Sequence, residues 1–62
     1  MKQMWQIMTL NGLQVGTFFA DGAADALHQL ALLRGYDSWA EYAEAFAVGK
    51  EVDRNQNRII LF

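Results

Sequence analysis

The stretch QMWQIMTLNGLQVGTFF, residues 3–19, decides the fold of this chain. It contains two runs rich in strand-forming residues, 3–10 and 13–19, which flank the dipeptide Asn11-Gly12. Asn-Gly between two such runs is typical of a β-hairpin with a two-residue type I′ turn. We therefore expect the chain to begin with an antiparallel hairpin.

This turn fixes the side chains that face each other across the hairpin. On one side, the expected pairs are Leu10 with Leu13, Met8 with Val15, Gln6 with Thr17, and Met4 with Phe19. The opposite side carries Trp5 beside Phe18 and Ile7 near Gly16. Since large apolar side chains occur on both sides, we expect both faces of the sheet to be covered.

An amphipathic segment over residues 22–34 follows the hairpin and predicts a first helix. Asp21 is its expected N-cap, and Gly35 its expected stop. Leu32 does not fit the apolar stripe of this helix, because it lies among polar side chains.

A second helix is predicted to begin at the capping box Ser38-Trp39-Ala40-Glu41 and to end at Gly49. In such a box, the Ser38 hydroxyl accepts from the amide of Glu41, and the Glu41 carboxylate accepts from the amide of Ser38. The two helices should form an αα-hairpin whose apolar stripes pack on the sheet.

The polar residues 53–57 predict a turn, and the β-branched run Arg58-Ile59-Ile60-Leu61-Phe62 predicts a last strand. This strand pairs either with the first strand of the chain or with a second subunit. We expect a single α+β domain over residues 1–62. Its predicted architecture is a three-stranded antiparallel sheet in ββααβ order, covered on one side by the αα-hairpin.

The composition favours an exposed apolar surface. The chain has 62 residues, of which 53% are hydrophobic, and it lacks cysteine and proline. Without disulfides, a domain this small depends on apolar burial or oligomerisation for its stability. A chain of this length buries only about 60% of the surface that its unfolded form exposes. We therefore expect a homodimer or a partner-protein interface.

Several functions are not expected from this sequence. The net charge of −2 argues against a dedicated nucleic-acid-binding protein. No metal or cofactor site is predicted, because the chain has one histidine, no cysteine and no glycine-rich phosphate loop. We interpret His28 and Asp25 as a solvated pair and do not expect an enzyme. No signal peptide or long apolar run is visible, so we expect a cytoplasmic protein without membrane contact.

Two surfaces remain as candidates for binding. The expected partner-binding residues are Trp5, Phe18 and Leu32 for an apolar contact, and Asp37, Glu41 and Glu44 for an electrostatic contact with a basic surface on another protein. An alternative hypothesis is a module for single-stranded nucleic acid, in which Trp5 and Phe18 stack on bases and Arg54 and Arg58 contact phosphates.

Three segments resemble a group of very short, mostly uncharacterised bacterial, plasmid and prophage proteins. They are Gly16-Thr17-Phe18-Phe19-Ala20, the helix segment Asp25-Ala26-Leu27-His28-Gln29-Leu30-Ala31, and Arg34-Gly35-Tyr36-Asp37-Ser38-Trp39-Ala40-Glu41-Tyr42. The resemblance spans residues 7–47 and implies a ββαα-type fold without family catalytic residues. Small proteins of phages and mobile elements often bind another protein, and anti-CRISPR inhibitors are one such class. The resemblance itself implies no defined activity. From what small accessory proteins commonly do, we expect a non-enzymatic protein-binding module, with inhibition of a host defence or nucleic-acid-processing complex as one form of it.

Overall fold

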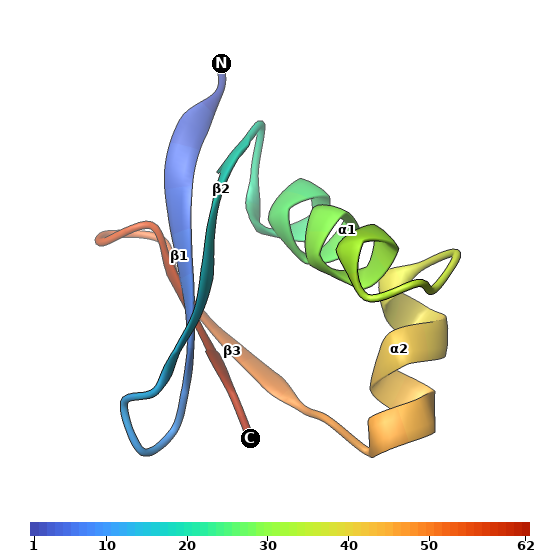
Figure 1. Ribbon diagram of the computed structural model, residues 1–62. Coiled ribbons are helices and arrows are strands. Elements are labelled where there is room, and N and C mark those ends of the chain that lie inside the picture. Colours follow the sequence, from blue (N-terminus) through green and yellow to red (C-terminus); the bar gives the residue numbers. More distant parts are fainter.

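The computed structural model describes residues 1–62 and places a sheet on one side of the molecule and two helices on the other (Figure 1). The elements, in chain order, are β1 (Gln3–Thr9), β2 (Gln14–Ala20), α1 (Ala23–Leu33), α2 (Trp39–Phe46), β3 (Lys50–Asp53) and β4 (Arg58–Leu61). The expected α+β class is confirmed. Neither helix has the length and apolar character that crossing a membrane requires.

The sheet differs from the expected three-stranded antiparallel arrangement. It has four strands in the order β2-β1-β4-β3, and it is mixed, because β4 runs parallel to β1. β3 was not predicted, since its four residues, KEVD, include three charged ones and charged residues are poor strand formers. The turn after β3 reverses the chain, and this additional reversal makes β4 parallel to β1. The last strand pairs within the chain, where Ile59 lies opposite Ile7.

The hairpin is confirmed, but its turn is not of type I′. The amide of Gly12 donates to the carbonyl of Thr9 at 2.9 Å, and the amide of Thr9 donates to the carbonyl of Leu13 at 2.8 Å. Gly12 has a φ of 88°, in the left-handed region. These features describe a three-residue loop closed by a left-handed glycine, a common alternative to the two-residue turn.

A β-bulge follows the turn. Met8 pairs with Gln14 and Ile7 pairs with Gly16, so that Val15 is an extra residue on β2. The expected pairs Met8 with Val15 and Leu10 with Leu13 are therefore wrong. The other four expected contacts are confirmed: Met4 with Phe19, Trp5 with Phe18, Gln6 with Thr17, and Ile7 with Gly16. Because side chains alternate between the faces of a sheet, one extra residue moves those beyond it to the opposite face.

The core lies between α1 and the face of the sheet that carries Trp5. Trp5, Ile7 and Ile59 from the strands are at most 4% exposed, and they pack with Leu27 and Leu30 of α1, which are at most 1% exposed. The apolar stripe of this helix thus supplies one half of the core.

The first helix begins one residue later than the sequence indicated. Its N-cap is Gly22 rather than Asp21, and no side chain caps it. The Asp25 carboxylate instead accepts from the amide of Asp21 at 3.1 Å. The expected stop at Gly35 is confirmed, because Gly35 has a φ of 89° and its amide donates to the carbonyl of Leu32 at 3.0 Å.

The second helix has the expected start. The amide of Glu41 donates to the Ser38 hydroxyl at 3.2 Å, whereas the Glu41 carboxylate accepts from the amide of Asp37 rather than that of Ser38. The helix ends at Ala47, in the left-handed region, and not at Gly49.

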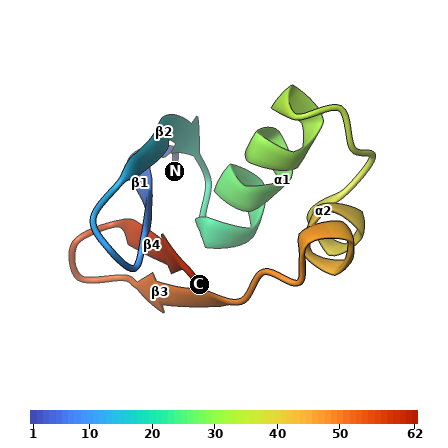
Figure 2. The same ribbon diagram turned by 60° about the horizontal axis from the view of Figure 1, so that its bottom comes forward.

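No residue of α2 is fully buried. Its aromatic residues pack on one another and on the preceding connection: Tyr42 lies 5.4 Å from Tyr36, 5.5 Å from Trp39 and 5.0 Å from Phe46 between ring centroids. Both helices lie on the same side of the sheet, with α1 closer to the strands than α2 (Figure 2).

The outer face of the sheet is not covered by any element of this chain. Met4 and Phe19 are more than half exposed on it. A polar group lies beside them, in which Gln6 donates to Gln14 and Gln14 donates to Thr17. The expectation that both faces are covered is therefore wrong for the single chain.

Candidate functional site

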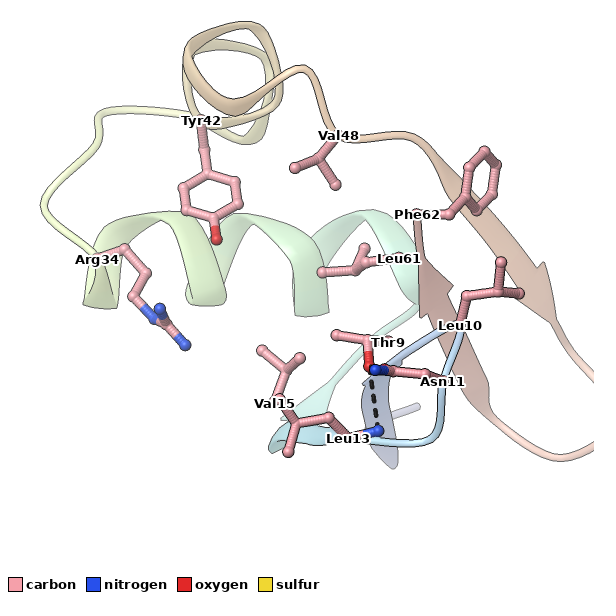
Figure 3. Close-up of a pocket in the computed structure, with 10 residues that line it drawn as sticks. All are labelled: Thr9, Leu10, Asn11, Leu13, Val15, Arg34, Tyr42, Val48, Leu61 and Phe62. Carbon is pink, nitrogen blue, oxygen red and sulfur yellow. Dashed lines mark hydrogen bonds between the residues drawn. The ribbon is translucent and has the colours of Figure 1, made fainter.

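An apolar groove of about 730 Å³ lies where the hairpin tip, the end of β4 and the two helices meet (Figure 3). The hairpin lines it with Thr9, Leu10, Asn11, Leu13 and Val15, and the last strand and its continuation line it with Leu61 and Phe62. The helical side contributes Arg34, Tyr42 and Val48. Its volume lies in the range typical of ligand pockets, about 300 to 1,000 Å³.

Two local features of the backbone form this groove. The bulge at Val15 turns the hairpin tip, so that Leu13 and Val15 line the same space as Leu61. Without the extra residue, Leu13 would lie on the outer face with Met4 and Phe19. The second feature is the position of α2, which contacts the core through Trp39 and leaves the groove beside Leu61 open.

The rim of the groove is apolar and open to solvent. Leu10 is 74% exposed, Leu13 is 66% exposed and Phe62 is 60% exposed. Single exposed apolar residues are ordinary, but a group of them around an apolar depression is typical of an interaction site. The floor is better covered, since Leu61 is buried and Val15 and Val48 are half-buried.

The polar groups of the groove are few. Thr9 and Asn11 hydrogen-bond to each other, and the Thr9 hydroxyl accepts from the amide of Leu13 at 3.0 Å. Arg34 and Tyr42 extend from the helical side, opposite Leu10 and Phe62 (Figure 3). Neither the guanidinium nor the Tyr42 hydroxyl has a hydrogen-bond or ion-pair partner within the chain.

This arrangement is suited to binding. No histidine side chain or carboxylate side chain lines the groove, so its side chains offer apolar contact, one cation and a few neutral hydrogen-bonding groups. His28, the only histidine, is exposed on α1 and does not line it. No group of three or more His, Asp or Glu side chains is placed to hold a metal ion.

The structure places the predicted apolar site residues in different environments. Trp5 is 4% exposed in the core, and Phe18 is half-buried against the same core. The Trp5 side chain therefore does not form part of the surface. Leu32 is 52% exposed on α1, but it does not line the groove.

The predicted acidic residues remain on the surface. Asp37, Glu41 and Glu44 are all exposed at the start of α2 or on it, and none of them forms an ion pair within the chain. They do not line the groove.

The residues of the nucleic-acid hypothesis are not brought together. Arg58 lies opposite Gln6 on the outer face and pairs with Asp53 at 3.5 Å, whereas Trp5 and Phe18 face the core. A stacking platform requires aromatic rings that are open to bases.

Sequence reasoning missed Leu10, Leu13 and Arg34 as site residues. One signal could have indicated the two leucines: they flank Asn11-Gly12 at the tip of a hairpin, where polar side chains are usual. Arg34 gave no comparable signal, because a basic residue at the end of a helix is common for reasons of stability.

Comparison with protein-family models, with curated proteins and with solved structures gave no match for this chain. The function proposed below therefore rests on the geometry of the groove.

Proposed function

We propose that this protein is a non-enzymatic binding module that docks on another protein through the groove and its rim. The observation that carries the proposal is the pair Leu10 and Leu13, both more than 60% exposed beside an apolar floor that no part of the chain fills. A partner segment that inserts apolar side chains here would remove these leucines from water.

Burial of the exposed leucines would supply a substantial part of the free energy of binding. Full burial of one leucine side chain contributes about 1.5 to 3 kcal/mol. Two leucines and the walls of the groove would offset a large part of the cost of association, which is at least about 4 kcal/mol. The docking segment therefore needs only a few apolar anchors.

The exposed carboxylates of Asp37, Glu41 and Glu44 add a second contact to the proposal. They lack internal ion-pair partners, so a basic surface on the partner that flanks the docking segment would complement them. When the partner belongs to a nucleic-acid-processing complex, such a module acts as an inhibitor by occupying the basic surface of that partner.

The test compares two hairpin variants in affinity capture from a bacterial lysate. Leu13→Glu places a charge in the groove, and Thr17→Glu places the same charge on the outer face of the same hairpin. Both positions are exposed, so both variants should fold, which near-ultraviolet circular dichroism verifies.

We expect wild type and Thr17→Glu to capture the same stoichiometric partner and Leu13→Glu to lose it. With the purified partner, titration calorimetry should give at least a tenfold weaker affinity for Leu13→Glu. Equal affinity of the two variants would contradict a docking site in the groove.

A further inference from the structure

The charge in the groove has the opposite sign to the charge of the chain as a whole. The protein has seven acidic and five basic residues. None of the acidic residues lines the groove, and Arg34 is the only charged residue that does. An occupant of this groove therefore meets one positive charge, at the helical end, and apolar walls elsewhere.

The backbone of Arg34 is fixed at the end of α1. This residue is the C-cap of α1, and its amide donates to the carbonyls of Leu30 and Ala31, both at 3.1 Å. Its guanidinium is exposed and has no carboxylate partner in either of the ion pairs that the chain forms. Its five N–H donors are thus open to water, and the Tyr42 hydroxyl belongs to the lining of the same groove.

A neutral apolar occupant would meet an unfavourable situation at this end. It would remove water from the guanidinium without replacing the lost hydrogen bonds, and desolvation of an unpaired charge is costly. A carboxylate at the same place would accept two hydrogen bonds from the guanidinium, which is the strongest common pairing of arginine. Arg34 therefore selects against neutral and cationic occupants as well as for anionic ones.

We infer that the segment that docks in the groove is an apolar peptide segment with one aspartate or glutamate, whose carboxylate pairs with Arg34. The inference rests on the proposed function and specifies the chemistry of its partner. Arg34 and Tyr42 lie opposite Leu10 and Phe62, so the apolar anchors of the segment lie to one side of its carboxylate (Figure 3).

The experiment selects binders from a random dodecapeptide library displayed on phage, with the full chain as bait. The baits are wild type, Arg34→Glu, and two controls. Leu13→Glu blocks the groove, and Arg54→Glu changes the charge of an exposed arginine that does not line the groove.

We expect wild type and Arg54→Glu to enrich the same peptides, apolar with one Asp or Glu, and Leu13→Glu to enrich none of them. A synthetic copy of the best peptide should bind Arg34→Ala at least tenfold more weakly. Wild type should bind the peptide at least tenfold more weakly when the Asp or Glu of the peptide is replaced by Asn or Gln. Arg34→Glu should bind the version in which that residue is lysine, because the charge pair is then reversed.

Each other result overturns the inference in a distinguishable way. Enriched peptides without an acidic residue, bound equally by wild type and Arg34→Ala, would refute the carboxylate and leave the proposed function in place. If no enriched peptide loses its binding in Leu13→Glu, both the inference and the proposed function are contradicted. Binding of dodecanoate without any peptide would identify the occupant as a lipid. A dimer that Leu13→Glu dissociates would identify it as a second copy of this chain.

Discussion

The ring of Phe62 lies directly on the backbone of Gly49. The two residues exchange hydrogen bonds, from the amide of Gly49 to the carbonyl of Phe62 at 2.7 Å and from the amide of Phe62 to the carbonyl of Gly49 at 3.0 Å. A Cβ atom at Gly49 would come within 2.7 Å of Cε1 of the ring. This pair extends the β3–β4 ladder by one step and fixes one wall of the groove.

Gly49→Ala should move the Phe62 ring without unfolding the protein. The added methyl group cannot coexist with the present ring position, but the ring is 60% exposed and free to turn away. We expect the free energy of unfolding in urea to fall by less than about 1 kcal/mol, since overpacking costs more only where the surroundings cannot yield. The aromatic proton resonances of Phe62 should shift at the same time.

A double-mutant cycle provides the control for this substitution. In a Phe62→Ala background, Gly49→Ala should have no measurable cost, because the clashing ring is gone. Unchanged Phe62 resonances in Gly49→Ala would contradict the contact.

Gly12→Ala should destabilise the hairpin tip. Gly12 has a φ of 88°, a backbone conformation that alanine adopts only with strain, although there is open space around it. We expect a loss of about 1 kcal/mol or more in the free energy of unfolding. Gly12→Asn is the matched control, because asparagine adopts the left-handed region more readily than alanine and the space around this position is open. An equal loss in both variants would show that backbone strain is not the cause.

The hairpin shows how far the sequence determines the structure and where it does not. The Asn11-Gly12 signal located the turn correctly, and the alternating pattern paired Trp5 with Phe18 correctly. Neither could show the bulge at Val15, because the alternating pattern does not reveal where one strand carries an extra residue. The groove depends on this bulge, and so the most important feature of the site was not predictable.

The sheet order escaped prediction for a related reason. The β-branched and apolar residues of the last strand, Arg58–Leu61, predict a strand by themselves. The direction of this strand relative to β1 depends on the number of chain reversals before it. One of these reversals is the turn between Lys50–Asp53 and the last strand. Because Lys50–Asp53 has three charged residues, its sequence does not indicate a strand. Local propensity therefore gave the class of the fold, and the pairing of distant segments decided its topology.

The helix caps, in contrast, depend on local chemistry, and Ser38 offers a direct test. Its hydroxyl accepts from the amide of Glu41, which would otherwise lack a partner in the first turn of α2. Ser38→Ala should lower the free energy of unfolding by about 0.5 to 2 kcal/mol. Urea titration followed by far-ultraviolet circular dichroism measures this change. Ser38→Asp should retain most of the stability, and an equal loss in both variants would argue against the cap.

Trp5 connects the core to the question of which residues contact a partner. Its side chain is 4% exposed, and its indole N–H has no hydrogen-bond partner. Trp5→Ala should cost about 3 to 5 kcal/mol, as removal of a large core ring does, which is a large fraction of the stability of a small domain. Trp5→Phe keeps an aromatic ring in the core and removes the unsatisfied N–H, so its cost should be clearly smaller.

The two variants separate a core role from a surface role. If Trp5 acts only in the core, Trp5→Phe should fold and bind the partner with the affinity of wild type, because its ring lies beneath α1 and outside the groove. Thermal unfolding and titration calorimetry on the same samples measure the two effects separately. A folded Trp5→Phe variant with at least tenfold weaker binding would show that the indole contacts the partner, and would return Trp5 to the binding surface that the sequence predicted.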